Sequence, residues 1–209
     1  MISFVVPRLA VMAGLTAITA VTSAGCGSTG EHATPAAGRN ALAPAVGGTS
    51  TAAFNDADVL FAQMMIPHHR QAVEMADLAA TRATDAQVRR LAATIKAAQE
   101  PEIATMTGWL KSWGRPEPSA GHGGDHGMNH GEMPGMMSET YMARLRAASG
   151  KDFDRLFLTG MIAHHQGAVT MARQEIANGA NPGAKALAER IATSQQAEID
   201  TMNRILARL

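Results

Sequence analysis

Residues 64–76, "MMIPHHRQAVEMA", place two adjacent histidines, a proline and three methionines in a segment with the apolar spacing of a helix. Residues 160–172, "GMIAHHQGAVTMA", repeat this pattern, so that position 68 matches 164 and position 69 matches 165. The correspondence continues at a constant offset and without a gap through Leu110 and Leu206. Self-similarity of this kind indicates a duplicated structural unit.

Each copy divides into two amphipathic segments with helical spacing. The turn "NGANPG" at 178–183 supplies a glycine stop, an asparagine cap and a proline for the first helical position, and Thr84 or Asp85 can begin the matching helix in the first copy. One hairpin of this length cannot bury both of its faces. We therefore predict an all-α protein, a four-helix bundle made from two repeated helical hairpins.

The predicted bundle occupies residues 53–209, with copy 1 at 53–113 and copy 2 at 149–209. Residues 114–137 predict a long His/Met-rich crossover between the copies, and "SETYMARLRAAS" at 138–149 predicts a short extra helix. Residues 1–25 contain one charge, Arg8, and an apolar stretch that ends in small residues, which is typical of a signal peptide.

Cys26 is the only cysteine and directly follows the signal pattern, so we predict that it is the lipidated cysteine of a bacterial lipoprotein. Residues 26–52 then predict a disordered tether. The alternative is an ordinary cleaved signal that leaves a free thiol. Both interpretations place the mature chain outside the cytoplasm, and the first predicts a cell-membrane lipoprotein that faces outside or the periplasm.

The composition excludes several classes of function. The 209-residue chain has no formal net charge and no Lys/Arg cluster, which argues against nucleic-acid partners and against electrostatic binding to an anionic membrane. A single cysteine excludes intrachain disulfides and Cys-based zinc sites. Methionine is abundant, at 14 residues, so thioether sulfur is the unusual chemical resource.

Helical geometry places polar groups in the expected core. His68 and His69 fall on opposite sides of the apolar stripe, so they can reach neighbouring helices but not the same one. On the second helix, Gln99 and Glu102 interrupt an apolar seam. Buried polar and charged groups need a partner, which is either a metal ion or a buried hydrogen-bond network in which His69 and Glu102 satisfy each other.

We favour a metal because the histidine pair and its methionines are duplicated intact. Imidazole and thioether ligands suit Cu(I) and also Ag(I). The candidate ligands are Met65, His68, His69, Met75, Glu102, Met106, Met161, His164, His165, Met171, Glu198 and Met202. A secondary candidate set in the crossover comprises His122, His126, Met128, His130, Met133, Met136 and Met137.

The two copies differ at two prolines. Pro67 precedes the histidines of copy 1 and Pro101 precedes its glutamate, where copy 2 has Ala163 and Ala197. A proline removes one helical hydrogen bond and kinks a helix. We therefore expect the two sites to be inequivalent, although both prolines could simply be tolerated kinks.

The stretches "MIPHHRQAVEMA", "FDRLFLTGMIAHHQGAVTMA" and "MPGMMSETYMARLRAASGKDFDRLF" resemble the bacterial domain-of-unknown-function-305 family over about residues 54–209. The resemblance implies a ferritin-like helical fold and an exported protein. Several members of the family are associated with copper or silver binding and tolerance. It also implies metal handling for His68, His69, His164, His165, Met65, Met75, Met161 and Met171.

The predicted function is extracytoplasmic copper binding for metal sequestration or tolerance, without enzymatic activity. One alternative is a structural or interaction module with a polar core. Another is a di-iron oxidase, but such sites need about four carboxylates and two Glu-x-x-His pairs. Only Glu102 and Glu198 are predicted as repeated core carboxylates, and neither has a histidine three residues later. The sequence leaves open a homo-oligomer and a partner that delivers or receives metal.

Overall fold

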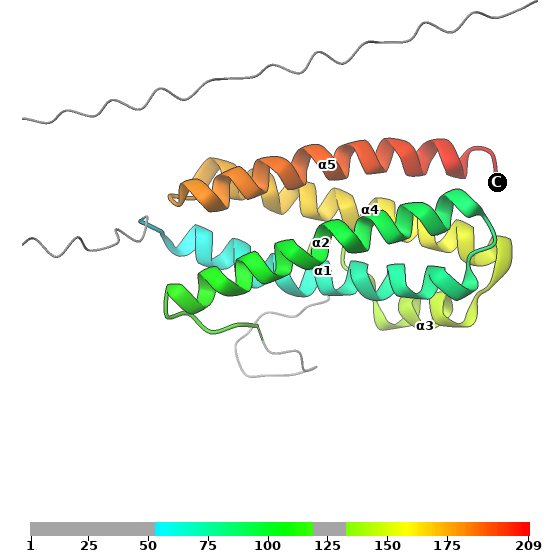
Figure 1. The fold of residues 1–209 in the computed structure, drawn as a ribbon, viewed down its shortest axis with the longest axis horizontal. Coiled ribbons are helices and arrows are strands. Elements are labelled where there is room, and N and C mark those ends of the chain that lie inside the picture. The colour runs from blue at the N-terminus through cyan, green and yellow to red at the C-terminus, as the bar shows by residue number, and fades with distance from the viewer. Residues whose placement is uncertain (1–52, 119–132) are drawn as a thin grey trace, which may run out of the picture. The chain divides into compact units, whose positions relative to one another are not determined.

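Five helices make up the described part of the chain, residues 53–118 and 133–209 of a computed structural model (Figure 1). They are α1 (Asp56–Arg82), α2 (Ala86–Ser112), α3 (Glu139–Ala147), α4 (Gly150–Asn178) and α5 (Pro182–Leu206). These two ranges contain no strand, so the predicted all-α class is confirmed. The predicted signal peptide, the lipidated Cys26, the tether, and the ligands His122, His126, Met128 and His130 lie outside the described residues.

Short polar side chains begin four of the helices. Asn55 caps α1 in a capping box with Asp58, and Ser138 caps α3. Asp85, one of the two predicted residues, begins α2, while Asn181 begins α5 directly before Pro182. Local sequence therefore fixes where these helices start.

The four long helices pack with α1 and α4 as the central pair. α2 packs along α1, α5 packs along α4, and α2 and α5 meet only slightly. Figure 1 shows that α1 and α4 run in opposite directions. The histidine pairs, which lie near the middle of these two helices, are therefore brought to the same level.

Two hydrophobic clusters lie on either side of that level, and each combines both copies. One contains Met75 of α1, which follows the histidines, with Met161 of α4, which precedes them. The other contains Met65 of α1 with Met171 of α4. Because α1 and α4 are antiparallel, a methionine of one copy packs with its non-equivalent partner from the other.

The prolines of copy 1 do not end their helices. α1 continues through Pro67 and α2 continues through Pro101. Of the helices in residues 53–118 and 133–209, none is sufficiently long and apolar to span a membrane.

Candidate metal centre

All four motif histidines are fully buried between the helices. His68 of α1 and His164 of α4 face each other, with ring centroids 3.7 Å apart and ring planes inclined by 35°. The ring of His165 lies 6.5 Å from that of His164. One imidazole from each copy thus meets the other at the contact between α1 and α4.

The second histidine of each pair contacts a glutamate on the neighbouring helix. Nε2 of His69 lies 2.7 Å from Oε2 of Glu102 on α2. Nε2 of His165 lies 2.7 Å from Oε2 of Glu198 on α5. Since a carboxylate only accepts, Nε2 carries the proton, and in the neutral ring the Nδ1 lone pair is left free. A histidine oriented by a carboxylate in this way is typical of metal ligands.

His68 is held by the crossover instead of by a helix. Its Nε2 donates to the carbonyl oxygen of Pro134 at 3.1 Å, which leaves Nδ1 as the unprotonated nitrogen. His164 has no equivalent bond, since neither of its ring nitrogens has a hydrogen-bond partner within residues 53–118 and 133–209. The predicted division of the histidine pair between different neighbours is confirmed, because His69 reaches α2 while His68 reaches α4 and the crossover.

Burial keeps the central pair neutral. Removal from water, together with the nearby His69, lowers the pKa of His68 to about 3. Burial, and then the neighbouring histidines, lowers the pKa of His164 well below its ordinary value of 6.5. Both rings are therefore in the unprotonated state that metal binding requires.

Five buried imidazole nitrogens have no hydrogen-bond partner among the described residues. They are Nδ1 of His68, His69 and His165 and both ring nitrogens of His164. Most buried polar atoms in proteins are satisfied, so this concentration of unpaired ring nitrogens at one level is unusual. In neutral rings it comprises four lone pairs, one on each histidine. A cation that accepts imidazole nitrogen fits this donor set.

The histidines and glutamates do not form a compact cluster of ligands. Within residues 53–118 and 133–209, no three His, Cys, Asp or Glu side chains converge around a common point.

The predicted methionine ligands are buried around this level. Met65, Met106 and Met171 belong to one hydrophobic cluster, and Met75, Met161 and Met202 belong to the other. In the crossover, Met133 is buried and Met136 and Met137 are half-buried. The helices thus place thioether sulfur in the layers that flank the histidines.

Two buried glutamines add further unsatisfied groups. Neither the amide oxygen nor the amide nitrogen of Gln99 has a partner, and the amide oxygen of Gln195 also lacks one, among the described residues. Both lie one turn from the glutamates that bind the histidines. They are additional polar groups at the edge of the centre.

Three residues were not predicted, two beside the histidine centre and one, Glu175, near the turn between α4 and α5. Gln71 pairs with the backbone of Met137, and Gly167, at the equivalent position of copy 2, leaves space for the backbone of Pro134 and Gly135. Glu175 is a buried acid where copy 1 has Ala79. Each of these positions departs from the repeat, and the departure was the signal that could have identified them.

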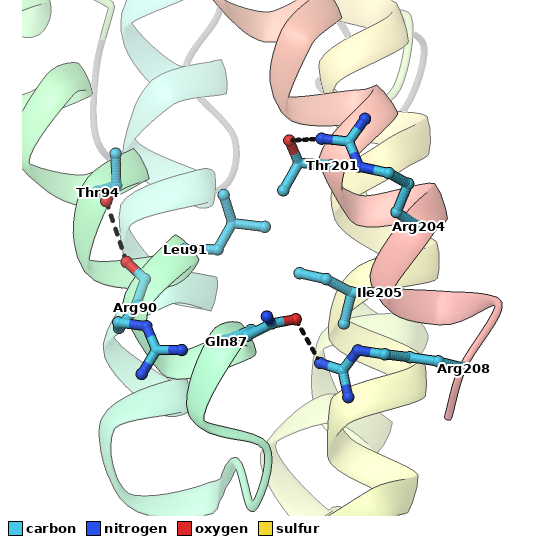
Figure 2. Close-up of a pocket in the computed structure, with 8 residues that line it drawn as sticks. All are labelled: Gln87, Arg90, Leu91, Thr94, Thr201, Arg204, Ile205 and Arg208. Carbon is cyan, nitrogen blue, oxygen red and sulfur yellow. Dashed lines mark hydrogen bonds between the residues drawn. The ribbon is translucent and has the colours of Figure 1, made fainter. Parts of the chain in front are cut away.

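A separate pocket of about 530 Å³ lies between the N-terminal part of α2 and the C-terminal part of α5. Figure 2 shows its apolar residues Leu91 and Ile205 beside three arginines, of which Arg208 bonds to Gln87. None of the predicted metal ligands lines it. It is therefore distinct from the histidine centre.

The chain is similar to proteins of one family. A family model described as "Domain of unknown function (DUF305)" matches residues 58–206. A crystal structure of a proposed secreted DUF305 protein from Streptomyces coelicolor is 37% identical, covers 73% of this chain and 93% of that one, and has a TM-score of 0.66.

CopM in its Cu(II)-bound form is 36% identical, with 72% of this chain and 96% of that chain covered and a TM-score of 0.61. CopM has also been solved in Cu(I)-bound, silver-bound and apo forms. A curated relative, an uncharacterized protein of Acanthamoeba polyphaga mimivirus, is 45% identical over 53 residues, which span 35% of its length. The match over residues 58–206 covers both histidine pairs and all five helices except the first two residues of α1. This chain therefore belongs to the DUF305 family.

Proposed function

We propose that this protein binds Cu(I), with Ag(I) as a competing ion, and holds it for sequestration or transfer without catalysing a reaction. The observation that carries the proposal is the set of five unsatisfied imidazole nitrogens at one buried level. The CopM structures with bound copper and silver support it, since the chain shares a third or more of its residues with that protein over most of its length.

We also propose that the protein acts outside the cytoplasm. The signal pattern in residues 1–25 and the single Cys26 favour export and a lipid anchor. The likeness to a proposed secreted protein of Streptomyces coelicolor supports export. Metabolic labelling with a fatty acid, compared with a Cys26→Ser variant, tests the anchor, and equal labelling of both would refute it.

Competition with a Cu(I) chelator tests the metal centre. A variant with His68, His69, His164 and His165 all changed to Gln should lose the tight binding component, because Gln offers no imidazole nitrogen. A companion variant with only His122, His126 and His130 changed to Ser removes crossover ligands and should keep that component. A quadruple variant that is folded by circular dichroism and binds as tightly as the wild type would overturn the proposal.

A purely structural role is the second candidate, and the two His–Glu bonds of 2.7 Å favour it. In that case each glutamate satisfies its histidine and copper has no preference for the folded state. A ligand that binds only the folded state must raise the melting temperature. A melting temperature that Cu(I) leaves unchanged would therefore support the structural role over metal binding.

A further inference from the structure

The central histidines are closed off from solvent. His68 and His164 have no exposed surface, so an ion can reach their nitrogens only if part of the structure moves. α1 and α4 are long helices packed against each other, with α2 and α5 packed along them. Movement of these helices would break the hydrophobic clusters on both sides of the pair.

A short non-helical segment also lies against the pair. Residues Met133–Met137, called the strap from here on, contain a turn in which the amide of Met136 donates to the carbonyl of Met133. The carbonyl of Pro134 accepts the Nε2 proton of His68. A Cβ at Gly135 would lie 2.5 Å from the carbonyl oxygen of Ala163 and 2.9 Å from that of His164, both on α4. The strap therefore contacts α1 through His68 and α4 through Gly135, at the level of the pair.

The two copies differ at the position where the strap lies against them. In copy 1, Gln71 donates to the carbonyl of Met137 at 2.9 Å and accepts from the amide of Met137 at 2.7 Å. In copy 2 the equivalent residue is Gly167, where a Cβ would overlap the carbonyl of Pro134. One copy thus supplies hydrogen bonds and the other supplies space, and the departure from the repeat is explained by the strap.

These contacts are weaker than helix packing. The strap is held by three side-chain hydrogen bonds, the buried Met133 and the half-buried Met136 and Met137. The long helices are held by two hydrophobic clusters that combine both copies. A segment with fewer buried contacts than the core opens at a lower free energy. Opening of the strap is therefore the least costly route by which the central pair can become accessible.

We propose that the strap is the entry gate for the metal ion at the His68–His164 pair and that Gln71 is the residue that holds it shut. The proposal rests on the proposed metal binding. The strap also carries thioethers at its two ends, on Met133 and on Met136 and Met137, which can hold a soft ion while the pair is uncovered. Gln71 acts on the rate of exchange and does not itself ligate the ion.

The test compares Gln71→Ala with Gln63→Ala. Gln63 is a matched control because it is also a half-buried glutamine of α1 that donates to a crossover carbonyl, that of Pro116, at 3.0 Å. The first readout uses metal-free protein and follows modification of His68 and His164 by diethyl pyrocarbonate, located by mass spectrometry. Loss of two hydrogen bonds should accelerate modification about tenfold or more in Gln71→Ala and leave Gln63→Ala at the wild-type rate.

The second readout is the rate at which Ag(I) enters the protein and leaves it to a chelator. Both rates should rise by a similar factor in Gln71→Ala, with the dissociation constant nearly unchanged. Gly167→Ala, which displaces the strap from the other side, should have the same effect on modification. Unchanged modification and exchange rates in both variants would overturn the gate. If the wild type binds no Ag(I) or Cu(I), the proposed function fails, while the modification rates still decide whether the strap controls access.

Discussion

Copy 1 and copy 2 agree at their histidine–glutamate bonds and differ in what surrounds them. Both bonds measure 2.7 Å and join the first helix of a copy to its second. Position 71 is a glutamine that binds the strap, whereas position 167 is a glycine that makes room for it. The shared residues therefore define the centre, and the differences adapt each copy to a segment that occurs only once.

A second comparison concerns two buried aspartates, each of which binds the turn of the other copy. Asp154 of α4 accepts from the amides of Thr84 and Asp85 at the start of α2. Asp58 of α1 accepts from the amides of Ala180 and Asn181 at the start of α5. Each hairpin turn is thus completed by the opposite copy, so the two hairpins depend on each other for their stability.

The largest expected effect comes from breaking one of these connections. Asp154→Ala leaves two part-buried backbone amides without an acceptor and should lower the free energy of unfolding by up to about 3 kcal/mol. Asp58→Ala should cost at least as much, since Asp58 also accepts from the amide of Asn55 at 2.6 Å. Urea unfolding measures both.

The control for that experiment is Asp152→Ala, which removes an exposed carboxylate from the same helix. It should change the free energy of unfolding by no more than about 0.5 kcal/mol. If Asp154→Ala were as stable as this control, the hairpins would not depend on each other through the aspartates.

The next effect is a pH dependence that arises from Glu175, an acid with no counterpart in copy 1. Glu175 is buried beside Asp58, and no N–H group reaches its oxygens in the described residues. Burial, together with the hydrogen bond and the charge of Asp58, raises the pKa of Glu175 from 4.5 to about 8, and Lys185 opposes the shift. Burial alone would raise the pKa of Asp58, but hydrogen bonds from Asn55, Glu175, Asn181 and Ala180 outweigh it and lower that pKa.

Between pH 4.5 and about 8 the native Glu175 keeps a proton that the unfolded chain has lost. The free energy of unfolding must therefore fall as pH rises through this window. Glu175→Gln keeps a donor to Asp58 without an ionisable group. It should match the wild type near pH 5 and exceed it at pH 8.5. One pKa unit corresponds to about 1.4 kcal/mol, so the roughly three units between pH 5 and the native pKa set an upper bound of about 4 kcal/mol. Solvent screening and the nearby Lys185 reduce the expected difference to on the order of 2 kcal/mol.

Urea unfolding at a series of pH values measures this slope. Glu175→Ala provides a further comparison, because it gives copy 2 the residue that copy 1 has at position 79. An identical slope in the wild type and in Glu175→Gln would show that Glu175 is already ionised in the native state.

The repeat and its helical spacing were sufficient to predict the all-α fold and the start of α5 at Pro182. The contact between His69 and Glu102 was one of the two arrangements that the sequence left open. These follow from local rules, since caps, periodicity and the side of a helix depend on neighbouring residues. The close, tilted contact between the rings of His68 and His164 was not predicted. It depends on α1 and α4 being antiparallel neighbours, which a pattern within one copy does not encode.

Long-range partners were missed for the same reason. Gln71, Gly167 and Glu175 are ordinary residues in their own helices, and their roles exist only because the strap or an aspartate from the other copy lies against them. Whether the twelve predicted bundle ligands bind metal stays a prediction. The structure buries the four histidines between the helices and divides the six methionines between the two flanking clusters.

A smaller effect is expected at the prolines, where copy 1 can be made like copy 2. Pro67 lies within α1, so the carbonyl of Gln63 has no helical amide to accept from at that position. Pro67→Ala supplies that amide and should raise the free energy of unfolding by about 1 kcal/mol, because the more flexible unfolded chain offsets part of the gain. Chemical denaturation checks the value. A loss of stability would mean that Pro67 is needed for the packing around the histidines.

The smallest difference is expected where the copies are identical. Glu102→Gln and Glu198→Gln each keep an oxygen that can accept from the histidine but remove the negative charge that makes the imidazole a stronger ligand. Loss of such a partner typically weakens metal binding about 10–100-fold. Since both bonds are 2.7 Å long and both glutamates have about a fifth of their side-chain surface exposed (19% and 18%), the two variants should lose Cu(I) affinity equally. Chelator competition on the two proteins measures this. A clear difference between the Cu(I) affinities of the two variants would show that the two halves of the centre are inequivalent. It would mean that the strap, which binds His68 and not His164, also affects how His69 and His165 bind metal.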